Sequence, residues 1–406
     1  MAIFACFVRL AFLGASLAAL FTRRGGKDRG SFAPDHCKVR ASPSRTEPSP
    51  LRGTRLLRMM CPMADDRRQF CSDNEAGIHP RVMEAIAEAN RGHVPSYGGD
   101  PLTAAVHDRF REIFGPETVT QLVFNGTAAN VVAAAGAVDA WQAVVSARTS
   151  HIHIDECGAI ERFAGCRVLV VESEDGKLDP ACLEQVPEGH AEPHQSKPRL
   201  LSITQATELG TVYTLGELRA LADAVHERGW LLHMDGARLA NAAASLGVGL
   251  RAVTADAGVD LLSFGGTKCG LMVGEAVVYF DPSLADRLAY VHKQGLQLAS
   301  KMRFLSAQFL ALLEDDLWLR IASHANAMAR RLHDAVHDLP GLRISRPTQA
   351  SAVFARVPLD RLETLRRLAR FAVWDEESGE VRWMASWDTT EEDVDDFALT
   401  LRSVLG

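Results

Sequence analysis

One stretch of this chain, residues 231–270, constrains its fold more than any other. It holds two short apolar runs, Leu231–Met234 and Val259–Phe264, and each run ends in a polar, glycine-containing turn. Between them, the Ala-rich segment Arg238–Leu246 has the composition of a helix. A buried strand, a helix and a second buried strand form a βαβ unit, in which the two strands lie parallel.

Two ionisable residues follow these runs closely, Asp235 after the first and Lys268 after the second. In parallel α/β sheets, ligands bind at the carboxyl ends of the strands, so we expect both side chains to face one crevice. Taken alone, Asp235 could cap the next helix and Lys268 could be a solvated loop residue. Their joint placement favours a ligand site, because the glycines around Lys268 allow a flat molecule to approach closely.

An aspartate and a lysine in one crevice suit pyridoxal 5'-phosphate. This cofactor needs a lysine for its Schiff base and an anion beside its pyridine nitrogen, which keeps that nitrogen protonated and the ring electron-poor. We therefore predict that Lys268 binds the cofactor covalently and that Asp235 faces the ring nitrogen. A P-loop interpretation of Gly265–Lys268 fails because the GxxxxGK[ST] spacing is missing.

The segments His233–Arg238 (HMDGAR) and Phe264–Lys268 (FGGTK) resemble the cofactor motifs of the L-threonine aldolase family, in particular its bacterial low-specificity branch. The resemblance extends from about Gln69 to the C-terminus. It implies an α/β protein with the PLP-dependent transferase fold (fold type I): a large domain with a mainly parallel sheet flanked by helices, and a smaller C-terminal α/β domain. The expected parts are an N-terminal extension (1–66), the large PLP-binding domain (67–320) and the small domain (321–406). In the small domain we expect strands near 341–345, 352–357 and 381–387 and helices near 359–370 and 391–405.

A second motif suits the cofactor phosphate. The strand candidate Gln121–Phe124 leads through Asn125–Asn130 into an Ala/Val-rich helix. The first N–H groups of a helix are unpaired and its dipole favours an anion, so Gly126 and Thr127 are expected to hold the phosphate. An ordinary helix cap is the alternative interpretation of Thr127.

The segment Thr149–Glu156 contains a His-x-His pattern and is interpreted as a strand. Two histidines two residues apart on a strand point to opposite faces, so we expect no shared metal ion. The family resemblance implies that His151 stacks on the pyridine ring with Glu156 close behind it. His153 is interpreted as a buried, hydrogen-bonded core residue.

The resemblance also implies residues that bind the substrate or complete the cofactor site. Arg382 lies within the apolar run Val381–Met384, where an unpaired guanidinium would be costly and a substrate α-carboxylate would pair with it. Arg303 resembles an arginine that reaches a phosphate across a subunit boundary, although a solvated helix arginine is an equally good interpretation. The expected substrate-binding residues are Ser72, Tyr97, Arg238 and Arg382, and Arg238 and Arg303 are also expected at the cofactor.

The sequence departs from many threonine aldolases at Thr204–Ala206, where it reads Thr-Gln-Ala in place of Thr-His-Asn. Gln205 cannot act as a general base at neutral pH. Removal of the substrate β-hydroxyl proton is therefore left to His151, Glu156 or a bound water.

The function implied is that of a lyase that splits L-threonine, L-allo-threonine and related β-hydroxy-α-amino acids into glycine and an aldehyde. Three alternatives remain. A phenylserine-preferring aldolase would differ in the size of its pocket. A β-eliminating lyase of the same fold would release ammonia and a keto acid. A PLP-binding protein without catalysis would bind the cofactor and turn nothing over.

The distribution of charge and the spacing of the cysteines limit which partners and which cellular compartment the sequence is compatible with. Residues 1–66 carry 11 Lys and Arg against 5 Asp and Glu, whereas the remainder carries 33 against 46. An acidic body argues against nucleic acid as a partner. The eight cysteines lack CxxC spacing and are interpreted as free thiols of a cytoplasmic protein. The resemblance further implies a homo-oligomer, a dimer or a tetramer.

The N-terminal extension has three interpretations. Met1–Phe21 is apolar apart from Arg9, which interrupts it as a membrane anchor and lies inside the core of a signal peptide rather than before it. The third interpretation is a translation start assigned too early, with the start at Met59, Met60 or Met63. The sequence favours the third, and we expect residues 1–66 to be poorly ordered, outside the catalytic fold and without a stable membrane partner.

Overall fold

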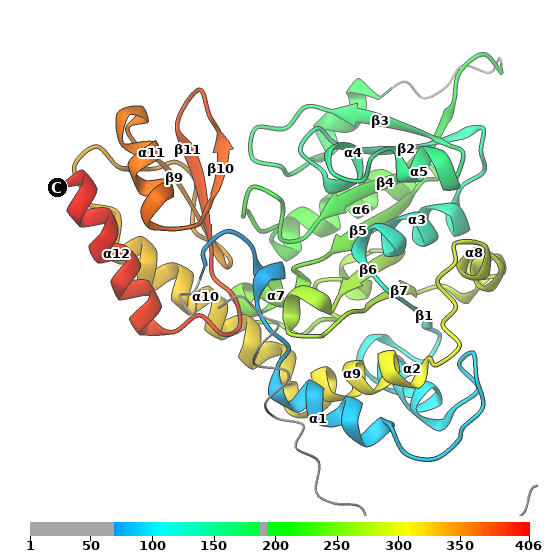
Figure 1. Ribbon diagram of the computed structural model, residues 1–406. Helices are drawn as coiled ribbons and strands as arrows, with labels where there is room; N and C mark the ends of the chain where they lie inside the picture. Colours follow the sequence, from blue (N-terminus) through cyan, green and yellow to red (C-terminus); the bar gives the residue numbers. More distant parts are fainter. Residues whose placement is uncertain (1–68, 187–192) are drawn as a thin grey trace, which may run out of the picture. The chain divides into compact units, whose positions relative to one another are not determined.

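The structure is a computed structural model and describes residues 69–186 and 193–406. The expected N-terminal extension (1–66) lies outside the described residues. Within the unit Asp65–Gly406 the chain alternates between strands and helices (Figure 1). The strands are β1 Val119–Val123, β2 Gln142–Ala147, β3 Arg167–Val171, β4 Lys197–Thr204, β5 Leu231–Gly236, β6 Leu261–Gly265, β7 Glu275–Tyr279, β8 Arg343–Ile344, β9 Ala352–Arg356, β10 Ala372–Asp375 and β11 Glu380–Met384. The helices are α1 Pro80–Ala89, α2 Pro101–Phe114, α3 Gly126–Ala137, α4 His151–Ile154, α5 Ala159–Phe163, α6 Leu215–Glu227, α7 Leu239–Leu246, α8 Leu288–Gln294, α9 Arg303–Leu313, α10 Leu317–Val336, α11 Leu359–Leu368 and α12 Glu391–Leu405.

Seven strands form the large sheet in the order β1-β7-β6-β5-β4-β2-β3. The strands β6, β5, β4, β2 and β3 pair in parallel, and β7 runs antiparallel to both of its neighbours. The predicted βαβ unit is confirmed as β5, α7 and β6, with Asp235 opposite Ser263 in the strand register. The fold class predicted from the sequence is therefore correct.

Helices cover both faces of this sheet, because successive strand residues point to opposite sides. Val144, Leu200 and Leu261 pack with α3 and α8 on one face. Their immediate neighbours in sequence, Val145, Leu201 and Leu262, pack into a second core with α2, α6 and α9 on the other face. Burial on both faces explains why these strands read as continuous apolar runs and not as alternating patterns.

A second, antiparallel sheet has the order β10-β11-β9-β8. Its core lies against α10, α11 and α12, and Trp383 at its centre is fully buried. The strands and helices expected in this part are present within a few residues of their predicted bounds. The strand β10 was not predicted.

The prediction of a strand over Thr149–Glu156 is wrong, and His153 is exposed and not the buried core residue that was expected. Strand β2 ends at Ala147, and the N–H groups of His153 and Ile154 both donate to the Ser150 carbonyl, so the segment forms the short helix α4. Among residues 69–186 and 193–406, no group of three or more His, Cys, Asp or Glu side chains is arranged to hold a metal ion. In the same part of the chain, no helix is long and apolar enough to cross a membrane.

The end of β6 lies against the turn that follows β5, and this contact requires glycine. A Cβ atom on Gly265 would lie 2.5 Å from the carbonyl oxygen of Ala237 and 2.7 Å from its Cα. Because these are backbone atoms, no side-chain rotation could relieve the overlap. Gly265 therefore sets how closely the Lys268 turn approaches the Asp235 turn.

We predict that Gly265→Ala lowers the free energy of unfolding by about 1–3 kcal/mol, because the two turns must separate. Urea denaturation of the cofactor-free protein would measure this. Gly249→Ala is the matched control, since a Cβ there meets nothing within 4 Å. Equal stability of the two variants would contradict the prediction.

Candidate active site

A cavity of about 330 Å³ lies at the carboxyl ends of the central parallel strands, where the sequence predicted a ligand crevice. Its wall includes Thr204 at the end of β4, Asp235 in β5 and Gly265 at the end of β6. Six of the residues predicted from the sequence line this cavity: Gly126, Thr127, His151, Asp235, Arg238 and Lys268.

Asp235 is fixed by two hydrogen bonds. The Asn130 side-chain amide donates to Oδ2 at 2.7 Å, and the Ala237 N–H donates to Oδ1 at 3.0 Å. The side chain is buried yet lines the cavity. This arrangement presents a carboxylate to the cavity in one fixed orientation.

His151 is oriented by a buried carboxylate. Its Nδ1 lies 3.0 Å from Oε1 of Glu156, and Asn130 donates to the same Glu156 oxygen at 2.8 Å. The hydrogen bond to Glu156 raises the pKa of His151 above its usual value, with a further contribution from Asp235. Burial raises the pKa of Glu156, although its hydrogen bonds to His151 and Asn130 oppose this.

Lys268 follows Gly265 and Gly266 on a short 3₁₀ turn, Thr267–Cys269. Burial and the charge of Arg238 lower the pKa of its ammonium group. A lysine with a lowered pKa more readily supplies the neutral amine that attacks a carbonyl. Behind this turn, Glu275 accepts a hydrogen bond from the Gly266 N–H at 2.6 Å, and burial raises the pKa of Glu275 to about 7.

The opposite wall of the cavity is the N-terminus of α3. The Asn125 side chain caps this helix by accepting from the Ala128 N–H at 2.9 Å. Gly126 and Thr127 form the first turn and line the cavity, and a Cβ on Gly126 would meet nothing within 4 Å. Their position at the start of a twelve-residue helix suits a phosphate group.

Arg238 makes a bidentate ion pair with Asp73 at 2.7 and 2.8 Å. Burial raises the pKa of Asp73, but the charges of Arg238 and Lys268 outweigh it and hold this pKa below its ordinary value. Arg382 in β11 donates to the Cys71 carbonyl at 3.2 Å, and its buried Nε has no hydrogen-bond partner among the described residues. Ser72 lies between these contacts, where its hydroxyl accepts from the Asn74 N–H.

Ser72 and Arg382 therefore lie next to the cavity without lining it, and Tyr97 and Arg303 lie elsewhere in the single chain. Tyr97 is 54% exposed, with Lys293 above its ring at 5.1 Å. Arg303 donates to the carbonyls of Arg91 and Gly92 at 3.3 and 3.2 Å.

Sequence reasoning missed several polar residues of this site, among them Asp73, Asn130, Glu208 and Glu275. Asn130 had a visible signal, since it is a polar residue in the otherwise apolar Ala/Val helix. Glu208 and Glu275 are acidic residues within or beside apolar segments, but nothing local in the sequence identifies their partners. Asp73 was passed over although Ser72 beside it was selected.

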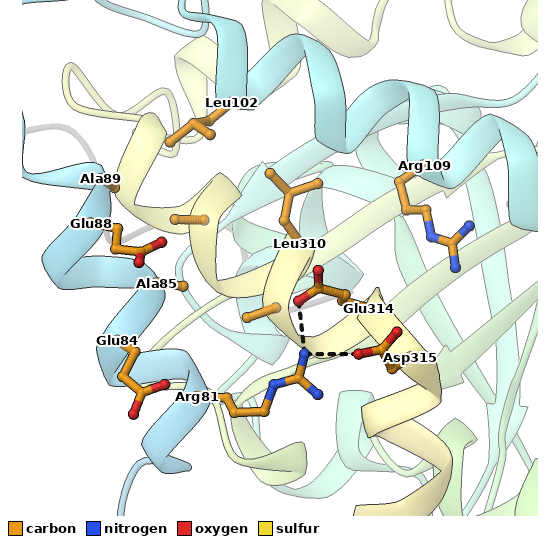
Figure 2. A pocket seen from close by; sticks show the side chains of 12 residues that line it. Arg81, Glu84, Ala85, Glu88, Ala89, Leu102, Arg109, Leu310, Glu314 and Asp315 are labelled. Carbon is orange, nitrogen blue, oxygen red and sulfur yellow. Dashed lines mark hydrogen bonds and ion pairs between the residues drawn. The ribbon is translucent and has the colours of Figure 1, made fainter.

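A larger hollow, about 800 Å³, lies among α1, α2 and α9 (Figure 2). Three of its charged side chains are paired: Figure 2 shows Arg81 bonded to Glu314 and Asp315, at 2.7 and 3.3 Å. It contains none of the residues predicted for cofactor or substrate, so we assign the chemistry to the smaller cavity.

Comparison with known proteins identifies the family of this chain. The sequence profile described as β-eliminating lyase matches residues 69–358. The low specificity L-threonine aldolase of Pseudomonas aeruginosa is 45% identical over 346 residues, which cover 85% of this chain and 100% of that protein. A threonine aldolase structure from Leishmania major superimposes with a TM-score of 0.79 at 28% identity, covering 83% of this chain and 99% of the other. An aspartate aminotransferase of Thermus thermophilus shares the fold alone, with a TM-score of 0.59 at 19% identity over 82% of this chain and 89% of the other.

The fold and the cavity are those of a PLP-dependent enzyme of fold type I. The sequence profile and the similarity to the Pseudomonas enzyme over that enzyme's whole length show which family within this fold the chain belongs to. The chain belongs to the β-eliminating lyase family and, by its similarity to curated relatives, to the L-threonine aldolases.

The residues present fit pyridoxal phosphate. The cavity joins an anion-binding helix start at Gly126, a fixed carboxylate at Asp235 and an amine of lowered pKa at Lys268. Gly265 lines the same cavity and contributes no side chain to it. These are the groups that the phosphate, the ring nitrogen and the aldehyde of the cofactor require.

The raised pKa of Glu275 predicts a pH dependence of stability. Because folding raises this pKa from 4.5 to about 7, the carboxyl group favours the folded state at low pH, and that contribution is lost as pH rises through 7. In the wild-type protein this titration lowers the free energy of unfolding between about pH 4.5 and pH 7. In Glu275→Gln that decrease should be smaller than in wild type by up to about 3 kcal/mol. Urea denaturation of the cofactor-free proteins across this range would measure it. The exposed Glu117→Gln is the control, and a wild-type pH profile in Glu275→Gln would contradict the prediction.

Proposed function

We propose that this protein cleaves L-threonine, L-allo-threonine and related β-hydroxy-α-amino acids to glycine and an aldehyde, as a PLP-dependent low-specificity L-threonine aldolase. The observation that carries this proposal is the meeting of Lys268, Asp235 and the start of α3 around one cavity, in a chain 45% identical to enzymes of that name. A preference for bulkier substrates such as phenylserine depends on the aldehyde side of the pocket, and it would appear as a higher kcat/KM for phenylserine than for threonine.

When bound, the cofactor supplies an electron sink for the pair released as the Cα–Cβ bond breaks. Lys268 supplies the amine that holds the cofactor, Asp235 keeps the ring nitrogen protonated, and Gly126 and Thr127 bind its phosphate. His151, held by Glu156, covers the ring and fixes its plane. Fixing the reacting groups in this way lowers the entropic part of the barrier.

The arginines select the substrate by its α-carboxylate. Arg238 is already paired with Asp73, so it acts as a fixed, oriented guanidinium. Arg382 has a buried Nε without a partner among the described residues, so a carboxylate would complete its hydrogen bonding. Ser72 adds a hydroxyl group between them. This recognition is the same for all α-amino acids, which suits an enzyme of low specificity for the rest of the side chain.

A homo-oligomer is part of the proposal. Tyr97 and Leu296 expose 54% and 81% of their surface, and the loop that contains Tyr97 is bonded to the segment that contains Leu296 through the Tyr97 N–H and the Ser300 carbonyl. Exposed apolar side chains gathered in this way are typical of protein interfaces. Gln297 in the same segment accepts from the Phe124 N–H, which places this surface near the phosphate end of the cavity. We propose that Tyr97 and Arg303 act in the active site of a neighbouring subunit.

The proposal also includes the domain division and the compartment. We propose that the large domain ends near residue 320 and that the catalytic fold does not need residues 1–66. Cys71, Cys157, Cys166, Cys182 and Cys269 are free thiols, which suits a cytoplasmic enzyme.

Lys268→Ala is the direct test of the function. We predict that the wild-type protein purified with pyridoxal phosphate shows the visible absorbance band of the lysine-bound cofactor and converts L-threonine to equimolar glycine and acetaldehyde. The variant should lose the band and both products, because no other described lysine lines the cavity. Release of ammonia and a keto acid without glycine would identify β-elimination. A band with no turnover of either kind would support the non-catalytic alternative.

Subunit complementation would test the role of Arg303. We predict that Arg303→Ala alone is weakly active and that co-expression with Lys268→Ala gives hybrids more active than either variant, because one site in each hybrid then has both an intact lysine and a neighbour's intact arginine. Differently tagged subunits would allow the hybrids to be isolated before assay. Hybrids with no gain in activity would place Arg303 outside the neighbour's site, and a monomer in analytical ultracentrifugation would rule out the interface.

A further inference from the structure

Glu208 occupies the cavity wall at the end of β4 and has no role in the mechanism so far. Its Oε1 accepts a hydrogen bond from the backbone N–H of His151 and another from the Thr204 hydroxyl, both at 2.8 Å. Its Oε2 is buried and has no hydrogen-bond partner among the described residues. Burying a carboxyl oxygen without a partner is costly, and in enzymes such a cost is typical of functional groups.

The same loop directs Gln205 away from the cavity. Gln205 is fully buried, and its side-chain amide makes two hydrogen bonds of 3.0 Å to the backbone of Tyr213. Gln205 does not line the cavity, whereas Thr204 and Glu208 do. The segment in which many threonine aldolases carry a histidine therefore presents a carboxyl group to the site in this chain.

We propose that the carboxylate of Glu208 takes the proton from the β-hydroxyl group of the substrate. The O–H bond breaks and its proton passes to Glu208, while the oxygen keeps the electron pair and forms the carbonyl of the aldehyde. The Cα–Cβ bond breaks, and its electron pair remains with the glycine fragment. Protonation at Cα then completes glycine. This inference rests on the proposed aldolase function.

The other candidates for the base are less suitable. Glu156 has no exposed side-chain surface and, unlike Glu208, does not line the cavity. The Nδ1 of His151 faces Glu156, and this hydrogen bond raises the pKa of His151, which favours the protonated imidazole, the form that cannot accept a proton. Among the titratable side chains that line the cavity, Glu208 is the one that follows β4.

The surroundings of Glu208 tune it for this role. Burial, with a contribution from the charge of Asp235 in β5, raises the pKa of Glu208 to about 7, and the hydrogen bonds from His151 and Thr204 moderate the rise. Arg238 and Tyr213 are the other ionisable groups that interact with it. A base with a pKa near the working pH is deprotonated in about half of the molecules yet still strong enough to accept a proton. Cleavage should therefore increase as pH rises through about 7.

Glu208→Gln would test the proposal with little change of shape, since the amide oxygen can still accept from His151 and Thr204. We expect threonine cleavage to fall by about 10²–10⁴-fold, the usual contribution of a general base. The rise of kcat with pH through about 7 should disappear. The exposed Glu161→Gln is the charge-matched control and should keep the wild-type rate and pH profile.

Two measurements separate a proton-transfer role from a structural one. Glycine has no β-hydroxyl group, so its binding, followed through the cofactor absorbance, and the exchange of its α-proton in D₂O should be unchanged in Glu208→Gln. Thr204→Val removes a hydrogen bond that stabilises the carboxylate, so it should raise the pKa of Glu208 and move the rise of kcat to higher pH.

The proposal is overturned if Glu208→Gln cleaves threonine at the wild-type rate with the wild-type pH profile. It is also overturned if cleavage, glycine binding and α-proton exchange all fall together, because Glu208 would then only support α4. Wild-type protein that binds the cofactor and glycine but cleaves no β-hydroxy-α-amino acid would overturn the aldolase function itself, an outcome visible before any variant is made.

Discussion

The side-chain amide of Asn130 holds two buried carboxylates, Asp235 and Glu156, and the geometry of the site depends on it. Two anions with so little access to water would repel one another strongly without a shared donor. Through Asp235 this amide fixes the group that we propose faces the ring nitrogen, and through Glu156 it fixes His151. One neutral side chain thus determines the positions of both Asp235 and His151.

The location of Asn130 on α3 adds a second constraint. Gly126 and Asn130 are four residues apart and therefore lie on the same side of the helix, separated by about 6 Å along its axis. The helix start suits a phosphate, and the Asn130 amide one turn later holds the Asp235 carboxylate, which we propose faces the ring nitrogen. A single rigid helix therefore sets the spacing between two recognition points of the cofactor. The glycine contact between Gly265 and Ala237 sets the spacing to the third, Lys268.

The sequence predicts which strands and residues form this site better than it predicts the hydrogen bonds between them. Apolar runs followed by Asp235 and Lys268 identify the parallel strands, and the rule for parallel sheets then brings both residues to one edge. The partners Asp73, Asn130 and Glu208 depend on contacts between segments far apart in the chain, such as the 105 residues between Asn130 and Asp235. No local pattern encodes them. The error at α4 has a local cause, because four residues with alternating histidine and isoleucine fit a strand as well as one turn of helix.

Pairing with arginine separates Asp73 from Glu208 and Glu275 in the direction of their pKa shifts. Asp73 faces two guanidinium N–H groups of Arg238, and its pKa is lowered despite burial. Glu208 and Glu275 accept only neutral donors, and burial raises both pKa values to about 7. The same residue class therefore serves as a permanent anion where it orients an arginine and as a titrating group where it accepts no hydrogen bond from a cationic side chain. This division follows from which carboxyl groups the fold pairs with arginine. It leaves Glu208 able to exchange protons near neutral pH on the cavity wall, where we propose that it meets the substrate hydroxyl group.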